Sequence, residues 1–169
     1  MTTFQLDQNI DDVKVVDACK AEGHGEANRL PVTLRDAEDP QLLAVVMAWN
    51  CALVTLDRKL PWELSAHIPE ENPGIVVVTN YPRKFPTMTS RIALRLLAAL
   101  KKLFPTWHEF SLRNSIVEIT AEGVAVSHVQ RGVIISDGYF EFSDESWLAP
   151  LQEALKRNSE RGAPRLPAS

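Results

Sequence analysis

The stretch CALVTL at positions 51–56 decides the fold, because it is a continuous apolar run of strand length that ends at Asp57. A second run, GIVVVT at positions 74–79, is richer still in β-branched residues. Strands that are hydrophobic on both faces belong in the middle of a sheet that helices cover on both sides. The two runs therefore predict an α/β protein, a three-layer α/β/α sandwich with a mainly parallel central sheet.

The segments before and between these runs have helical patterns. A short extended apolar segment at 3–6 precedes residues 10–22, where apolar side chains recur every three positions along one side. Asp39, followed by a proline, predicts the start of an almost wholly apolar helix, since aspartate caps free amides and proline fits the first helical position. Residues 89–104 have the clearest amphipathic pattern, with one apolar and one basic face.

Beyond position 105 the pattern changes to short, closely spaced strands. The segments are WHEFSL at 107–112, SIVEIT at 115–120, GVAVSHV at 123–129 and GVIIS at 132–136. Such spacing predicts antiparallel strands added at the edge of the sheet. These four segments thus belong to a C-terminal extension of the core.

The C-terminal part ends in one more helix and a tail. An amphipathic pattern fits residues 144–157, and the segment NSERGAPRLPAS at 158–169 has the composition of a disordered tail. We therefore predict a single domain over residues 1–157, with a core at about 3–105 and a strand-and-helix extension at 106–157.

Length and composition set the limits for function. A chain of 169 residues has room for one domain with a proper core, and 45% hydrophobic with 24% charged residues is an ordinary globular balance. No apolar run approaches the roughly 20 residues that span a bilayer, and the N-terminus lacks the order of a secretory signal. We expect a cytoplasmic protein without a membrane partner. With a net charge of −4, nucleic-acid binding would need a local basic surface.

The cysteines and histidines do not indicate a zinc site. Cys19 and Cys51 lie in helix-like or apolar segments without a CxxC neighbour, so we expect buried thiols rather than a disulfide. The four histidines are scattered and lack the spacing of zinc ligands.

Three aspartates lie where strands end or a helix starts. Asp7 follows the segment at 3–6, Asp57 follows the run at 51–56, and Asp39 begins the helix that leads into that run. Residues just past parallel strands converge on one crevice, and a helix running back along the sheet brings its start to the same level. We therefore expect the three carboxylates to meet at one edge.

Clustered carboxylates repel each other unless a cation neutralises them. Hard oxygen ligands suit Mg²⁺ or Mn²⁺, which activates water and stabilises charge on a transferring phosphate. The chemistry that this cluster predicts is phosphodiester hydrolysis. Each aspartate also has a simpler interpretation, since Asp7 and Asp39 fit helix starts and Asp57 fits a turn.

Four segments together resemble the PIN-like nuclease superfamily, most closely its small bacterial members. They are FQLDQNI at 4–10, AEGHG at 21–25, DAEDPQLLAVVMAWNCALVTLDRKL at 36–60 and PGIVVVTN at 73–80. The resemblance implies that Asp7, Asp39 and Asp57 bind Mg²⁺ or Mn²⁺ and cleave RNA. Such proteins are often toxins of toxin–antitoxin pairs, so RNA, a small antitoxin protein and a second copy of the chain are the partners to consider.

Two positions depart from the family pattern. The pattern LLDEN has an acidic residue where this chain has Gln8, and the pattern DxDF has its second aspartate where this chain has Lys59. A lysine can neutralise a carboxylate or hold a phosphate, but it cannot bind the metal as aspartate does. These departures motivate an alternative, a non-catalytic PIN-like domain that binds nucleic acid or protein.

Polar and basic residues elsewhere in the sequence are candidate supports for the acidic site. Asn9, Arg58 and Lys59 lie next to the acidic positions, where Asn9 fits either a helix cap or a polar contact in the site. Basic residues in and just before the predicted helix at 89–104 fit either phosphate contacts or a solvated helix face; they are Arg83, Lys84, Arg91, Arg95 and Lys102.

A third hypothesis comes from a different class of protein. In a phospho-receiver signalling domain, Asp11 and Asp12 would be the acidic pair, Asp57 the phosphoacceptor and Thr79 the switch residue. Asp11 and Asp12 fall inside the predicted first helix rather than at a strand end, and no lysine follows a clear next strand. This hypothesis is therefore the weakest of the three.

Overall fold

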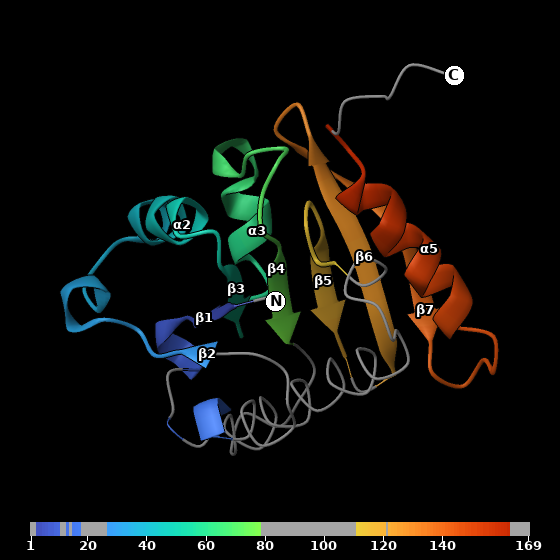
Figure 1. Ribbon diagram of the computed structural model, residues 1–169, viewed down its shortest axis with the longest axis horizontal. Helices are drawn as coiled ribbons and strands as arrows, with labels where there is room; N and C mark the ends of the chain where they lie inside the picture. The colour runs from blue at the N-terminus through green and yellow to red at the C-terminus, as the bar shows by residue number, and fades with distance from the viewer. Residues whose placement is uncertain are drawn as a thin grey trace, which may run out of the picture.

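A seven-stranded sheet forms the centre of the protein in the computed structural model, which describes residues 3–10, 13, 15–17, 27–78, 111–120 and 122–162. The order of the strands is β2-β1-β3-β4-β5-β6-β7 (Figure 1). Neighbours from β2 to β5 pair in parallel, whereas β5 with β6 and β6 with β7 pair antiparallel. The strands are β1 (Phe4–Leu6), β2 (Ala27–Asn28), β3 (Ala52–Thr55), β4 (Ile75–Val78), β5 (Ile116–Ile119), β6 (Gly123–Gln130) and β7 (Val133–Glu141).

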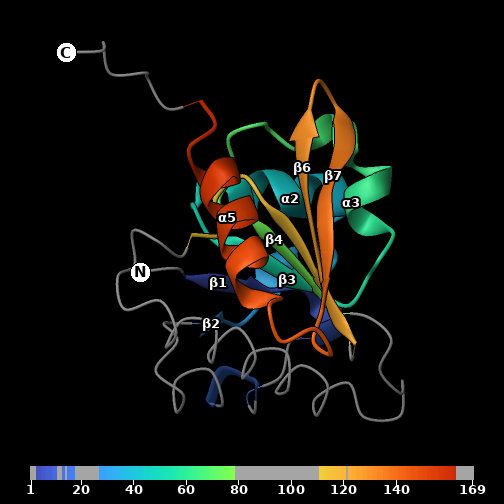
Figure 2. The same ribbon diagram turned by 90° about the vertical axis from the view of Figure 1, so that its right-hand side faces the viewer.

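Helices pack against this sheet from two directions. The α-helices are α2 (Asp39–Ala48), α3 (Leu60–Glu63) and α5 (Leu148–Ser159), and the 3-10 helices are η1 (Gln8–Ile10), η2 (Val32–Leu34) and η3 (Ser65–His67). Figure 2 shows α5 and α3 on opposite sides of the strands. An α/β protein with a mainly parallel sheet and antiparallel C-terminal strands, as the sequence predicts, is therefore confirmed.

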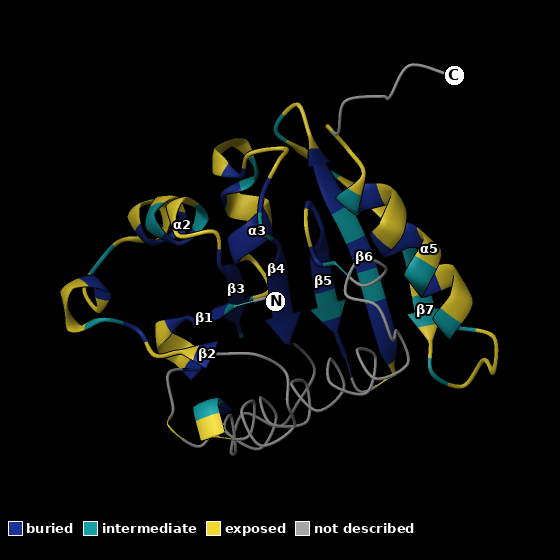
Figure 3. Cartoon of the chain, viewed as in Figure 1, coloured by how far each residue is buried: buried dark blue, intermediate teal, exposed yellow. Residues whose placement is uncertain are grey.

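The two central strands explain why the apolar runs decide the fold. Every residue of β3 and β4 is buried, as the dark blue of both strands in Figure 3 shows. Alternate residues serve two separate clusters: Leu53 packs with residues of α2, whereas Val54 and Val76 pack with residues of α5. Removal of apolar surface from water on both faces stabilises these strands at the centre of the sheet.

The strand order determines where a site can form. Because β1, β3, β4 and β5 are parallel, their carboxyl ends lie at one edge of the sheet. The connections diverge at β1 and β3, since β2 lies on one side of this pair and β4 on the other. Ligands of open α/β sheets bind at such a point, beyond the carboxyl ends of the strands.

Several boundaries differ from the prediction in the N-terminal half. The segment LPVTL at 30–34 contains the 3-10 helix η2, and the two-residue strand β2 was not predicted. Residues 13 and 15–17 are helical, within the predicted helix at 10–22. The predicted helix at 89–104 lies outside the described residues, as do residues 18–26, which include Cys19.

The C-terminal extension also differs in detail. β5 is parallel to β4, not antiparallel, and Ser111 and Leu112 at the end of the predicted strand 107–112 are not in a strand. α5 begins at Leu148 rather than at 144, because the carboxylate of Asp144 accepts the backbone N–H and the hydroxyl of Ser146 in a turn. The helix continues to Ser159, so the predicted disordered tail is wrong for its first residues.

Two smaller predictions concern single features. Cys51 is a free, buried thiol, as predicted. In the part of the chain that the structure describes, no helix combines the length and the apolar character needed to cross a membrane.

Candidate active site at the carboxyl ends of β1 and β3

Asp7 is a buried carboxylate at the end of β1. Its backbone N–H donates to the carbonyl of Val54 at 2.9 Å, which extends the β1–β3 ladder by one residue. Its Oδ1 accepts the N–H of Gln8 at 2.6 Å, and its Oδ2 accepts the hydroxyl of Thr55 at 2.7 Å. Only 7% of Asp7 is exposed. The side chain is therefore held in one orientation by two donors and the ladder.

The hydroxyl of Thr55 connects the polar residues of this edge. Besides donating to Asp7, it accepts the side-chain amide of Asn9 at 3.2 Å and the backbone N–H of Asp57 at 3.1 Å. The carbonyl oxygen of Asn9 accepts the N–H of Leu56 at 3.1 Å. Asn9 thus ties η1 to the end of β3.

Sequence reasoning missed Thr55. The available signal was a single hydroxyl at the end of an otherwise apolar strand, two residues before an aspartate. A threonine at that spacing accepts the N–H two residues on, as Thr55 does for Asp57.

Asp57 is half-buried and shapes the turn into α3. Its Oδ1 accepts the N–H of Lys59 at 2.9 Å, and its carbonyl accepts the N–H of Leu60 at 3.3 Å. Asp57 therefore acts as a turn residue, as its simpler interpretation predicts. Its Oδ2 is left without a hydrogen bond among the described residues.

Asp39 is the first residue of α2 rather than its cap. The N-cap position is Glu38, which makes no side-chain hydrogen bond to the helix. The prediction that Asp39 caps the helix is therefore wrong by one position, because Pro40 occupies the second helical position and not the first. The side chain of Asp39 is exposed.

The three aspartates interact electrostatically. Burial raises the pKa of Asp7, the negative charges of Asp39 and Asp57 raise it further, and the hydrogen bonds from Thr55 and Gln8 lower it. Asp7 is buried at the end of β1, Asp57 is half-buried in the turn after β3, and Asp39 is exposed at the start of α2.

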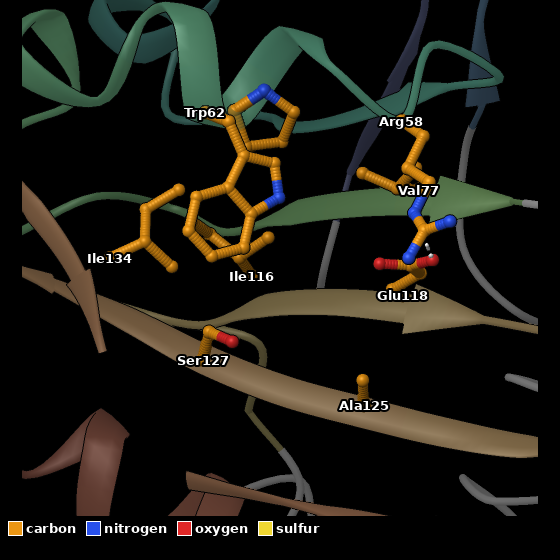
Figure 4. A pocket seen from close by; sticks show the side chains of 9 residues that line it. Arg58, Trp62, Val77, Ile116, Glu118, Ala125, Ser127 and Ile134 are labelled. Carbon is orange, nitrogen blue, oxygen red and sulfur yellow. Dashed lines mark ion pairs between the residues drawn. The ribbon is translucent and has the colours of Figure 1, made fainter. Parts of the chain in front are cut away.

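The neighbouring cations do not neutralise Asp7 directly. The guanidinium of Arg58 lies over β5 and pairs with Glu118 at 3.2 Å, as Figure 4 shows. Lys59 is exposed and contacts Asp57 through its backbone N–H. The basic residues predicted to contact phosphate lie outside the described residues; they are Arg83, Lys84, Arg91, Arg95 and Lys102.

The oxygen ligands at this edge fit an open Mg²⁺ or Mn²⁺ site and not a closed one. Among the residues that the structure describes, no group of three or more histidine, cysteine, aspartate or glutamate side chains is close enough together to hold a metal ion. Mg²⁺ is commonly held by only one or two carboxylates, with water and substrate phosphates completing its shell. Asp7 and Asp57 supply such a pair of hard oxygen ligands.

Comparisons of the chain with models of protein families, with curated proteins and with solved structures gave no match. The site itself must therefore support any functional conclusion.

Proposed function

We propose that this protein is a metal-dependent ribonuclease of the PIN-like type, built as a three-layer α/β/α sandwich. The observation that supports it is the environment of Asp7, a buried carboxylate whose pKa is raised by burial and by the negative charges of Asp39 and Asp57. A buried carboxylate that faces like charges is costly unless a cation joins it. A divalent cation would offset this cost at the point of the sheet where ligands of such folds bind.

Each residue would have a defined part in the reaction. Asp7 and Asp57 would hold the cation, and the exposed Asp39 would add negative charge to the site. Thr55 and the N–H of Gln8 fix the two oxygens of Asp7, while Asn9 keeps Thr55 and η1 in register. When bound, Mg²⁺ or Mn²⁺ supplies a more acidic water and charge stabilisation on the scissile phosphate.

The substrate and partners follow from the same proposal. RNA is the proposed substrate, a small antitoxin protein the proposed regulator, and the cytoplasm the proposed location. The resemblance of residues 4–80 to toxin-related PIN-like proteins supports this choice. A second copy of the chain is a further proposed partner.

Cleavage of a labelled single-stranded RNA by the purified protein tests the proposal. We expect cleavage with Mg²⁺ or Mn²⁺, none with a chelator, and a loss in Asp7→Asn larger than the roughly 10- to 100-fold that removal of an outer-shell partner costs. Asp144→Asn is the matched control, because Asp144 is an exposed aspartate outside the site. Cleavage that persists in Asp7→Asn would refute the assignment.

Binding without cleavage would support the non-catalytic alternative. Gln8 and Lys59 motivate it, since both lower the negative charge next to Asp7 and Asp57 relative to the family pattern. RNA that binds the wild-type protein but stays intact with either metal would favour that function.

One observation favours a receiver-like function as a second candidate. The parallel part of the sheet has the order β2-β1-β3-β4-β5, which doubly wound receiver domains share, and Asp57 follows β3. However, Thr120 follows β5 in place of a lysine, and Asp11, Asp12 and Thr79 lie outside the described residues. Labelling of Asp57 by acetyl phosphate would support this function, and an unlabelled Asp57 would exclude it.

A further inference from the structure

A second polar region lies at the opposite end of the strands, where the parallel strands begin. β6 runs antiparallel to β5, so its last residues return to the amino ends of the parallel strands, at the top of Figure 1. A cavity of about 310 Å³ is present there, and its polar lining consists of Glu70, Glu71, His128, Gln130 and Arg161. The acidic site at the carboxyl ends of β1 and β3 has no residue in this cavity.

His128 lines the cavity and belongs to a buried hydrogen-bond network. Its Nδ1 lies 2.9 and 3.0 Å from the two carboxylate oxygens of Asp137. Asp137 also accepts the side-chain amide of Asn158 at 3.0 Å, and that amide in turn donates to the hydroxyl of Ser115 at 3.2 Å. The network holds the imidazole ring in one place.

One atom of this network lacks a partner. Nε2 of His128 is buried and has no hydrogen-bond partner among the described residues. The whole residue is only 4% exposed, so water cannot easily take the place of a partner. Because the carboxylate of Asp137 takes the proton-bearing Nδ1, the neutral ring leaves a lone pair on Nε2. A buried acceptor without a donor costs free energy, so this atom is suited to a ligand that donates a hydrogen bond.

The charges around the cavity favour a cation. Glu70, Glu71 and Asp137 carry three negative charges, while Arg161 and Arg113, the partners of Asp137 and Glu71, carry two positive ones. The balance is one negative charge. Glu70 is engaged only by the backbone N–H of Arg131, at 2.7 Å, among the described residues.

Arg161 is the lining side chain that can give way to a ligand. Its Nε donates to Asn158 at 2.9 Å, but its Nη2 is 3.8 Å from Asp137, and its side chain is 42% exposed. Rotation of this side chain would leave the contacts between His128 and Asp137 intact.

We propose that this cavity binds a small organic cation, an amine of metabolite size. Its ammonium group faces Glu70 and Glu71, and a second N–H group donates to Nε2 of His128. A metal ion fits less well, because the described residues contain no group of histidine, cysteine and carboxylate side chains that could hold one. The volume of about 310 Å³ accommodates a chain of several carbon atoms between the two ends.

Three probes of equal chain length test the charge requirement by calorimetry: 1,4-diaminobutane, 1,4-butanediol and succinate. We expect the diamine to bind and the diol and succinate not to bind. In the variant Glu70→Gln/Glu71→Gln, the affinity for the diamine should fall at least about 10-fold. Glu153→Gln, an exposed residue of α5 outside the cavity, is the matched control and should bind as the wild type does.

A second measurement distinguishes this cavity from the acidic edge, which could also attract a diamine. The ¹⁵N signal of His128 Nε2 should shift on addition of the diamine, in the wild type and equally in Asp7→Asn. The proposal is overturned if the diamine does not bind, if the diol binds as well as the diamine, or if binding leaves the His128 signal unchanged.

Discussion

Two aspartates whose side chains are largely shielded from solvent, Asp137 and Asp7, have different surroundings. Asp137 receives the ring of His128 and the amide of Asn158, and the guanidinium of Arg161 lies 3.8 Å away. Asp7 accepts one hydroxyl and one backbone N–H, and the charges that act on it are the negative ones of Asp39 and Asp57. A positive charge lies near the first carboxylate, whereas negative charges act on the second.

The difference separates a structural carboxylate from a candidate catalytic one. A buried charge that is paired and hydrogen-bonded is satisfied within the fold, and its removal breaks a network. A buried charge that is repelled by its neighbours destabilises the fold and is suited to bind a cation. Substitutions at the two edges should therefore affect different measurements.

The largest expected effect is a loss of stability at Asp137, whose carboxylate is fully engaged in hydrogen bonds. Asp137→Ala removes the common acceptor of His128 and Asn158, and each buried donor left without an acceptor costs about 1–3 kcal/mol. Denaturant unfolding followed by circular dichroism measures this loss. Glu153→Ala, at an exposed position of α5, should stay within about 0.5 kcal/mol of the wild type. If Asp137→Ala were as stable as this control, the network would not have the structural role inferred here.

Thr55→Val should affect activity at the acidic edge. Valine keeps the shape of the buried side chain but cannot donate to Asp7 or accept from Asn9 and Asp57. Loss of such an orienting partner costs about 10- to 100-fold in metal affinity or activity. RNA cleavage rates at saturating Mg²⁺ and the Mg²⁺ affinity measure it. Thr55→Ser, which keeps the hydroxyl, should recover most of the activity, and equal losses in both variants would contradict the role of the hydroxyl.

The raised pKa of Asp7 predicts a pH dependence of stability with a definite sign. Because the folded protein holds this proton more tightly than the unfolded chain, the associated stability is fully present below the unfolded pKa. It is lost as the pH rises through the folded pKa. Without metal, Asp7→Asn should therefore gain stability relative to the wild type as the pH rises from 3 towards 7.

Melting temperatures of the two proteins in chelator, recorded across that range, measure this difference. Addition of Mg²⁺ at pH 7 should stabilise the wild type and leave Asp7→Asn nearly unchanged, since only an occupied site adds binding free energy to the folded state. A constant difference between the two proteins at all pH values would show that Asp7 does not titrate as inferred.

The sequence predicted the parts of this molecule that depend on local pattern. The runs at 51–56 and 74–79 predicted buried central strands because burial on both faces leaves few polar residues. Asp7 and Asp57 were found because each follows a strand. Thr55 was missed because its hydrogen bonds come from η1 and from the turn after β3, which only folding brings together.

The cavity could not be predicted from the sequence, because its lining residues also come together only when the chain folds. Its polar lining comes from the loop after η3, the end of β6 and the residues after α5. Asn158 was assigned to a disordered tail by composition, yet it is completely buried because its amide bonds to Asp137 and Ser115. Composition describes the chain on its own and does not record such long-range partners.

The smallest expected effect comes from a substitution of Lys59, which stands where the family pattern has its second aspartate. Lys59→Asp places a carboxylate where the family pattern has one and removes a positive charge next to Asp57. Because the side chain is exposed, the change in electrostatic free energy should be about 0.2–1 kcal/mol, or up to about fivefold in Mg²⁺ affinity. Calorimetry at low ionic strength measures it, and added salt should reduce the gain. Arg157→Asp, a charge reversal at an exposed residue of α5, is the control for net charge alone. An equal gain in both variants would mean that Lys59 acts through net charge and lies outside the site.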